Sequence, residues 1–228
     1  MMKNLIIAID GTAASGKSTT AKILAKKLGI LPIDTGAMYR AVTLKALKLG
    51  ISVENREAIE ELARSTEITQ KLIDGTVRTF LDGVDVTDEI RSPEVDKAVS
   101  LVSSYAGVRE RLVELQRKMA KQGNVVLEGR DIGTVVLPDA PLKFYMDASL
   151  EERARRRLGD LRKKGANPTL EEVMEELKRR DEFDSKREIA PLKKADDAIY
   201  IDTTDLTVEA QVEIILKEVE KRFGGDDP

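Results

Sequence analysis

The chain has 228 residues, with 38 basic and 41 acidic side chains and a formal net charge of −3. This length suits one compact domain carrying small insertions, so we expect a single domain over residues 1–228. The sequence contains no cysteine and no histidine, which excludes disulfides, thiolate zinc sites, cysteine nucleophiles and histidine acid–base chemistry. The remaining lysine, arginine, carboxylate, hydroxyl and backbone groups suit phosphoryl transfer, which depends on positioning and charge stabilisation more than on a tuned base.

The near balance of charge, with no strongly basic tail, favours small anionic ligands over a nucleic-acid polymer. No stretch approaches the roughly 20 apolar residues that span a membrane. Residues 1–10 lack the apolar run and cleavage site of a signal peptide. We therefore expect a cytoplasmic protein that has no membrane partner.

Short apolar runs alternate with helical patterns along the chain. The runs predict buried parallel strands at residues 5–9, 30–33, 125–127, 142–146 and 198–201. Pro32 places the second strand near a sheet edge. Apolar spacing predicts helices at residues 21–28, 39–49, 108–119, 150–161, 170–187 and 208–223. This alternation predicts a three-layer α/β fold around a five-stranded parallel sheet.

Residues 67–89 have a different pattern. Apolar and polar side chains alternate there around Asp74-Gly75 and Asp82-Gly83, which is typical of small antiparallel hairpins. We interpret the segment as an insertion beside the site of a phosphoryl acceptor.

A glycine-rich motif lies between the first strand and the first helix. It has the spacing of a P-loop, Gly, four residues, Gly-Lys-Ser. Its backbone N–H groups and the helix N-terminus would cradle ATP phosphates, with the lysine on the β- and γ-phosphates and the serine hydroxyl on Mg²⁺. The alternative is a chance turn before a helix. The expected ATP-binding residues are Gly11, Thr12, Ala13, Ala14, Ser15, Gly16, Lys17, Ser18 and Thr19, with Ser18 also the metal ligand.

Two further clusters follow strands, at the sheet edge where such folds bind ligands. After the second strand, Thr35 is a candidate to hydrogen-bond an acceptor and Arg40 to hold a phosphate. The alternatives are a helix N-cap at Asp34 or Thr35 and a solvated surface arginine. After the third strand, Arg130 and Asp131 offer donors and acceptors to a ligand, or else form a structural ion pair within a tight turn.

Two helices carry charged rows. Arg153, Arg156 and Arg157 share one helix face. They could close over transferring phosphates as a mobile lid, or form a solvated basic face. Arg180, which is followed at spacings of four and three by Asp184 and Arg187, starts a second row. That row could offer two guanidinium groups and one carboxylate to a single ligand, or it could form an intrahelical salt-bridge ladder.

Together these motifs resemble the bacterial cytidylate (CMP) kinases over nearly the whole chain, from residues 9 to 202. The markers are residues 34–40, residues 128–136, Glu152-Arg153-Ala154 with Arg156-Arg157, and residues 189–192. The resemblance implies a nucleoside monophosphate kinase fold. Its core would be residues 1–62, 95–149 and 168–228, its acceptor-binding insert residues 63–94, and its lid residues 150–167.

The resemblance also implies an activity, transfer of the γ-phosphoryl group of ATP to CMP and dCMP with Mg²⁺, by a monomer. The catalytic residues it implies are Lys17, Arg130, Arg156, Arg157 and Arg180. The CMP-binding residues it implies are Thr35, Arg40, Ser100, Arg109, Arg130, Asp131, Arg180, Asp184 and Arg187. Glu128 departs from the family pattern, which expects aspartate, and this leaves open whether it can hold a water on Mg²⁺.

The sequence leaves other acceptors and other functions open. The acceptor could be UMP, AMP or shikimate, or the chain could bind ATP without catalysis. A nucleic-acid binder using the arginine clusters is disfavoured, because four Phe, four Tyr and no Trp provide few stacking platforms.

Overall fold

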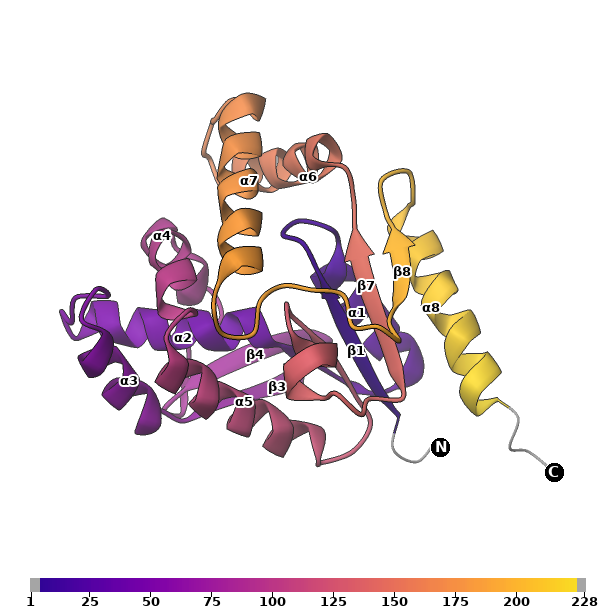
Figure 1. Ribbon diagram of the computed structural model, residues 1–228, viewed down its shortest axis with the longest axis horizontal. Helices are drawn as coiled ribbons and strands as arrows, with labels where there is room; N and C mark the ends of the chain where they lie inside the picture. Colours follow the sequence, from indigo (N-terminus) through magenta and orange to yellow (C-terminus); the bar gives the residue numbers. More distant parts are fainter. Residues whose placement is uncertain (1–4, 225–228) are drawn as a thin grey trace.

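The computed structural model describes residues 5–224 (Figure 1). Residues 1–4, part of the segment searched for a signal peptide, and residues 225–228, part of the predicted core, lie outside the described residues. Within residues 5–224 the main sheet has five parallel strands in the order β2-β6-β1-β7-β8. The strands are β1 (Ile6–Gly11), β2 (Leu31–Asp34), β6 (Val125–Glu128), β7 (Leu142–Asp147) and β8 (Ile199–Asp202). The α/β class and the parallel sheet predicted from the sequence are confirmed.

The strands read as continuous apolar runs because helices cover both faces of the sheet. On β1, Ile7 and Ile9 pack toward one face, whereas Ala8 packs toward the other. All are fully buried, and burying a side chain of isoleucine size stabilises a fold by about 1.5–3 kcal/mol. Pro32 lies on β2, which is an edge strand as predicted.

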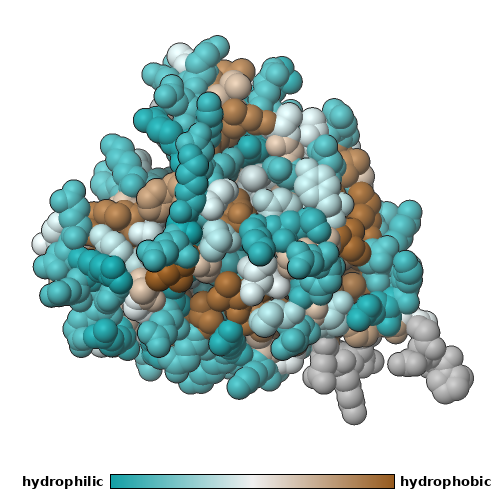
Figure 2. Space-filling model, in the orientation of Figure 1, coloured by the Kyte–Doolittle hydropathy of each residue, from teal (hydrophilic) through white to brown (hydrophobic). Residues whose placement is uncertain are grey.

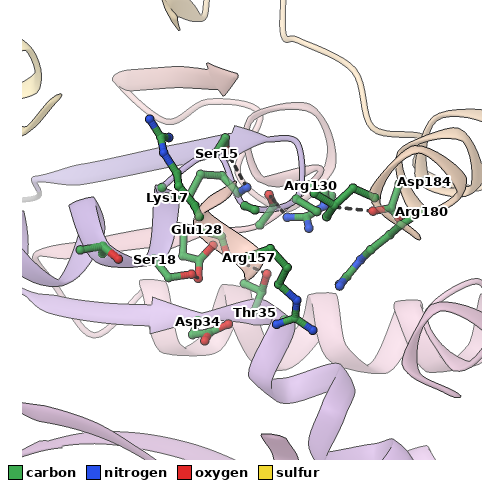
Figure 3. A pocket seen from close by; sticks show the side chains of 18 of the residues that line it. Ser15, Lys17, Ser18, Asp34, Thr35, Glu128, Arg130, Arg157, Arg180 and Asp184 are labelled. Atoms are coloured by element: carbon green, nitrogen blue, oxygen red, sulfur yellow. Dashed lines mark hydrogen bonds and ion pairs between the residues drawn. The ribbon is translucent and has the colours of Figure 1, made fainter. Parts of the chain in front are cut away.

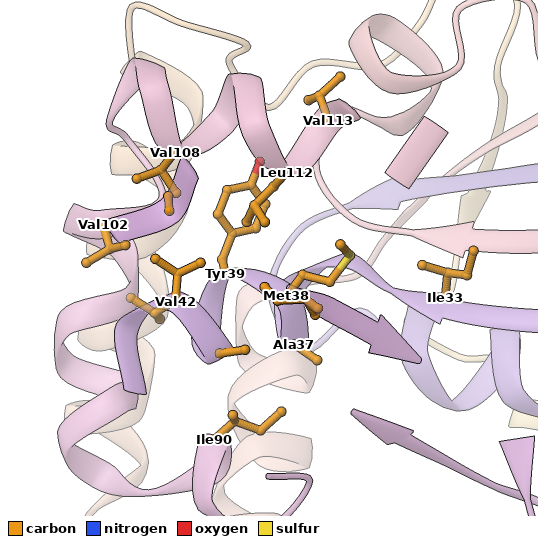
Figure 4. Packing of buried hydrophobic residues seen from close by; sticks show 14 of the residues in the cluster. Ile33, Ala37, Met38, Tyr39, Val42, Ile90, Val102, Val108, Leu112 and Val113 are labelled. Atoms are coloured by element: carbon orange, nitrogen blue, oxygen red, sulfur yellow. The ribbon is translucent and has the colours of Figure 1, made fainter. Parts of the chain in front are cut away.

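The helices form the outer layers. Helices α1 and α8 cover the face that includes Ile7 and Ile9, and α2 and α5 cover the other. Figure 4 shows Met38 and Tyr39 of α2 packed beside Leu112 of α5. The helices are α1 (Lys17–Leu28), α2 (Thr35–Lys48), α3 (Arg56–Arg64), α4 (Pro93–Val102), α5 (Ala106–Ala120), α6 (Leu150–Lys163), α7 (Leu170–Lys186) and α8 (Val208–Phe223).

Helices α3 and α4 were not predicted. Each has a capping residue, Asn55 for α3 and Ser92 for α4, whose side chain accepts from a backbone N–H of the first turn. Helix α3 is short and buries little more than Ile59 and Ala63. Helix α3 has only nine residues, and so short a helix is stabilised mainly by tertiary packing, here against α5.

The segment after α3 forms a small antiparallel sheet, as predicted. It contains β3 (Ile68–Ile73), β4 (Thr76–Leu81) and β5 (Val84–Asp85), in that order. Asp74 and Gly75 have φ values of 50° and 73°, and Asp82 and Gly83 have 48° and 84°. These left-handed pairs are the turns that join twisted antiparallel strands tightly.

A buried glutamine attaches this small sheet to the core. Gln70 of β3 accepts from the backbone N–H of Asp34 at 2.9 Å and donates to its carbonyl at 2.8 Å. The side-chain amide thus mimics a strand neighbour at the end of β2. Asp34 therefore lies where the core and the small sheet meet.

Helices α6 and α7 stand beyond the carboxyl ends of the strands (Figure 1). They pack on one another and on the P-loop through a small apolar cluster of Ala13, Ala154, Leu158, Val173 and Leu177. The surface in Figure 2 is mostly hydrophilic, and no helix of residues 5–224 is long and apolar enough to cross a membrane. Two short turns complete the fold, a 3-10 turn η1 (Glu89–Arg91) and a π-helical turn η2 (Ile132–Val136).

Candidate active site

The P-loop adopts the strand, loop and helix arrangement that the motif predicts. Gly11 ends β1 with φ 146°, and a Cβ there would lie 1.8 Å from the carbonyl oxygen of Met146 on β7. Gly16 caps α1 with φ 97°. These positions require glycine for different reasons, close approach of two backbones at Gly11 and left-handed backbone at Gly16.

Neighbouring strand ends and α7 hold the loop in shape. Thr12 donates through its hydroxyl to Asp147 at 2.6 Å, at the end of β7. Thr203, just after β8, donates to the carbonyl of Ser15 at 2.9 Å. Asp181 of α7 accepts from the backbone N–H of Ala13 at 3.3 Å. The loop is therefore fixed to the sheet on one side and to the helix pair α6–α7 on the other.

Lys17 is 4% exposed and folds back over the loop. Its Nζ donates to the carbonyl of Thr12 at 2.5 Å and to Ser15 Oγ at 3.2 Å. Burial, and next the nearby charge of Arg130, lower the pKa of Lys17 to about 7. An anion bound in the loop would reverse this shift, since it would compensate the buried charge.

A cavity of about 770 Å³ begins at the P-loop and extends to the inner faces of α6 and α7. Figure 3 shows Arg157 and Arg180 among the side chains that line it; Arg157 comes from α6 and Arg180 from α7. Most of the predicted site residues line it. They are residues 13–19, Thr35, Arg40, Ser100, Arg109, Arg130, Asp131, Arg156, Arg157, Arg180, Asp184 and Arg187.

Gly11 and Thr12 are the exceptions. Neither is among the described residues that line the cavity. Gly11 lies against β7, and the Thr12 hydroxyl is directed to Asp147. Of the predicted ATP-binding residues, these two therefore shape the loop from behind.

The cluster after β2 combines capping with access to the cavity. Asp34 caps α2 by accepting from the N–H of Ala37 at 2.8 Å, and it pairs with Arg91 at 2.6 Å. Thr35 lines the cavity and donates to the carbonyl of Glu128 at 2.8 Å. Arg40 is only 7% exposed and pairs with Asp96. The alternative of a solvated surface arginine at position 40 is therefore wrong.

Arg130 and Asp131 do not pair with each other in a turn, so that alternative is also wrong. Arg130 Nε donates to Asp184 of α7 at 3.0 Å, the contact drawn in Figure 3. Asp131 pairs with Arg109 of α5 and lies 3.8 Å from Arg187. Side chains from the end of β6, α5 and the end of α7 thus form one charged network on the cavity wall.

The row on α7 forms one intrahelical ion pair of the salt-bridge ladder that the sequence left open, and its carboxylate also has a partner outside the helix. Asp184 contacts Arg187 at 3.6 Å but also Arg130 from another element. Among the described side chains, Arg180 Nε and Arg187 Nη2 are buried without a hydrogen-bond partner. Burial, and next the charge of Arg130, lower the pKa of Arg180 to about 10. Buried cationic donors without a hydrogen-bond partner are suited to bind an anionic ligand.

The arginines of α6 separate into two roles. Arg153 is 6% exposed and donates to Asp181 at 2.5 Å and to the carbonyl of Ala148 at 3.0 Å, so it fixes α6 to α7 and to the end of β7. Arg156 donates to the carbonyl of Thr203 at 2.6 Å. Arg157 Nη2 lies 3.3 Å from Asp96 of α4. Arg156 and Arg157 both line the cavity, Arg156 beside the loop after β8 and Arg157 beside α4.

Oxygen atoms that could ligate a metal ion lie beside the P-loop serine. Ser18 donates to Glu128 Oε1 at 2.5 Å, so the longer side chain at position 128 does reach the P-loop. Burial, and next the negative charge of Asp34, raise the pKa of Glu128. Hard oxygen ligands beside a phosphate-binding loop match what Mg²⁺ prefers, and a cation there would offset the repulsion between the two carboxylates.

Asp10 connects the P-loop strand to the loop after β6. It is buried and accepts from the backbone N–H groups of Ile132 and Gly133, both at 2.7 Å. Burial raises its pKa to about 6. This carboxylate was not predicted to matter, because its partners are more than 120 residues away in the sequence.

Sequence reasoning also missed one end of the cavity. Leu206, Thr207, Val208 and Gln211 line it beside Gly16. No motif marks these residues. They could have been found only from the topology, which places the loop after β8 next to the P-loop.

The fold is that of a P-loop kinase. A shikimate kinase from Bacteroides thetaiotaomicron superposes with a TM-score of 0.50 at 15% identity, covering 95% of this chain and 98% of that one. At 15% identity this similarity supports a shared fold and nothing more specific.

The sequence comparisons are more specific. The family model described as Cytidylate kinase matches residues 7–221. A cytidylate kinase from Caldanaerobacter subterraneus subsp. tengcongensis is 56% identical over 96% of both chains. One from Desulfitobacterium hafniense is 54% identical over 95% of this chain and 93% of the relative. The chain belongs to the cytidylate kinase family, and the predicted resemblance is confirmed.

Proposed function

We propose that this protein transfers the γ-phosphoryl group of ATP to CMP, and also to dCMP, giving ADP with CDP or dCDP. The observation that carries the proposal is the single cavity that joins a P-loop to a group of buried arginines. A kinase needs a donor site and an acceptor site that share the transferred group. Membership of the cytidylate kinase family supports the choice of acceptor.

ATP phosphates would bind at the P-loop end of the cavity. Residues 13–19 would donate backbone N–H groups, with the positive end of α1 directed at the phosphates. Lys17 would leave the Thr12 carbonyl and contact the β- and γ-phosphates. Arg156, between the P-loop and the loop after β8, would lie on the donor side.

The CMP phosphate would bind among the arginines at the other end. Arg40, Arg130 and Arg180 converge there from α2, the end of β6 and α7. Planar guanidinium forks suit the bidentate recognition of phosphate oxygens. Thr35 and Ser100 would add hydroxyl contacts at the same end.

The sugar and the base of CMP would bind against the charged network. Asp131 and Asp184 are acceptors for sugar hydroxyls or the exocyclic amine, and Arg109 and Arg187 fix both carboxylates. This network is a rigid set of donors and acceptors, which is what discrimination between bases requires.

Mg²⁺ is the cofactor that fits the donor set. Ser18 would ligate it, and Glu128, which already contacts Ser18, would hold it directly or through water. When bound, Mg²⁺ would neutralise charge on the β- and γ-phosphates.

The transfer itself needs no strong base. The second pKa of a phosphate is about 6, so the acceptor oxygen is largely deprotonated at neutral pH and can attack the γ-phosphorus in line. Lys17, Arg157 and Arg180 would stabilise the equatorial oxygens as the bond to the ADP oxygen breaks. Closure of α6 over the cavity would exclude water and so suppress ATP hydrolysis.

We also propose the division into a core (1–62, 95–149 and 168–228), an acceptor-binding insert (63–94) and a lid (150–167). The small antiparallel sheet and the outlying α6 support it. A cytoplasmic location and a monomeric state complete the proposal.

A coupled assay of ADP release tests the function. ATP with Mg²⁺ is combined in turn with CMP, dCMP, UMP, AMP, GMP and shikimate. We expect CMP and dCMP to exceed the others clearly. Preference for another acceptor would overturn the acceptor assignment, and ATP binding without ADP release for any of them would indicate a non-catalytic ATP binder.

A further inference from the structure

One carboxylate lies among the arginines of the cavity without belonging to the predicted site. Asp96 is in the first turn of α4, one turn before Ser100. One of its oxygens pairs with Arg40 Nη1, and the other lies 3.3 Å from Arg157 Nη2. Arg40 and Arg157 are among the described residues that line the cavity, whereas Asp96 is not.

The three side chains come from three helices. Arg40 on α2 and Asp96 on α4 belong to the proposed core, whereas Arg157 is on α6 of the lid. A second contact, from Lys164 Nζ to the carbonyl of Arg91 at 3.5 Å, joins the lid to the same side of the cavity. The Asp96 carboxylate is thus a bridge by which the lid rests on the acceptor side.

The bridge leaves the arginines able to bind a ligand. It engages Nη1 of Arg40 and Nη2 of Arg157, and each guanidinium has five N–H groups. Arg40 is 8% exposed at its side chain, Asp96 21% and Arg157 23%. In such partly desolvated surroundings an ion pair can fix the orientation of a long side chain that would otherwise be mobile.

We infer that Asp96 is a positioning residue for phosphoryl transfer: by pairing with Arg40 and Arg157 together, it docks the lid on α4 and holds the Arg157 fork over the acceptor end of the cavity. This inference rests on the proposed function. Asp96 touches no reacting atom and acts through the two arginines.

The alternative is that Asp96 merely compensates the buried charge of Arg40. In that case its loss would lower stability and the fraction of active protein, but it would not depend on Arg157. Coupling between Asp96 and Arg157 in kcat is therefore the decisive quantity.

A double-mutant cycle measures this coupling. The variants are Asp96→Asn, Arg157→Gln and the double mutant, assayed with ATP, Mg²⁺ and CMP. We expect Asp96→Asn to lower kcat about tenfold, with KM for CMP changed much less, since a misplaced group above the reacting atoms affects the transition state most. The double mutant should be no slower than the slower single mutant.

Glu94→Gln is the matched control. Glu94 is in the same first turn of α4 but is exposed, so its loss removes the same charge near the same helix end. We expect wild-type kcat for it. Unchanged kcat in Asp96→Asn, or rate losses that multiply in the double mutant, would overturn the inference.

Hydrogen exchange of the substrate-free protein gives a readout that does not depend on activity. Deuterium uptake across α6 should rise in Asp96→Asn and Arg157→Gln, but not in Glu94→Gln. If Asp96→Asn fails to fold, Arg157→Gln breaks the same contact from its more exposed side, and unchanged uptake there would refute the docking. If the wild type shows no CMP-dependent turnover, the proposed function fails while the exchange experiment still decides whether Asp96 docks the lid.

Discussion

ATP binding should change the protonation of Lys17, because the environment of its amine differs greatly between the empty loop and the loop that holds ATP phosphates. In the structure the amine is buried near Arg130, and its pKa is lowered to about 7. Phosphates in the loop would raise this pKa back toward the ordinary lysine value of about 10.4. At pH 8 about one tenth of the free protein then carries the Lys17 proton, so ATP binding should take up about 0.9 proton per site.

Titration calorimetry measures this uptake directly. The observed binding enthalpy at pH 8 is plotted against the ionisation enthalpy of several buffers, and the slope is the number of protons exchanged. The variant Lys17→Met, which keeps the volume of the side chain but cannot titrate, should give a slope near zero. At pH 8 Asp10, whose pKa is about 6, is already ionised and contributes little.

A wild-type slope near zero at pH 8 would refute the reasoning, since it would mean that Lys17 is already charged in the empty loop. Equal slopes for the wild type and Lys17→Met would assign the proton to another group. Either result would leave the phosphate-binding role of Lys17 standing but would show that burial does not lower its pKa to about 7 in the empty loop.

Three other predictions concern single side chains. Asp184→Ala should raise KM for CMP much more than KM for ATP, because it breaks the network at the acceptor end, and equal effects on both would contradict the assignment. Gly11→Ala should cost about 2–4 kcal/mol in denaturant unfolding, since its Cβ would lie 1.8 Å from a backbone oxygen, whereas Gly159→Ala, with nothing within 4 Å, should cost nothing. Gln70→Ala should cost about 2 kcal/mol by leaving the N–H and carbonyl of Asp34 unpaired, and wild-type stability would argue against this anchor.

The sequence was informative where local chemistry decides the structure. The apolar runs, the Asp-Gly turns, the edge position of Pro32 and the P-loop all follow from backbone preferences and short-range spacing. These features depend on neighbours within a few positions, so a pattern can record them.

The partners of the charged residues could not be predicted in this way. Arg130 and Asp131 are adjacent in sequence, yet one pairs with Asp184 and the other with Arg109, 54 and 22 residues away. Adjacent side chains at the end of a strand point in different directions, and which helix each one meets depends on how the chain crosses over the sheet. The sequence predicts that charges gather at this edge but not how they pair.

The pairing that results leaves an excess of positive charge in the cavity. The carboxylates of Asp131, Asp184 and Asp96 are each engaged by arginines, whereas Arg180 has a buried Nε without a hydrogen-bond partner and a lowered pKa. Lys17 has a lowered pKa as well. Both shifts record a free-energy cost of holding cations close together away from water. Phosphate groups of the donor and the acceptor would remove that cost. The residues that we propose to stabilise the transferred charge would therefore also make the empty cavity less stable than the occupied one.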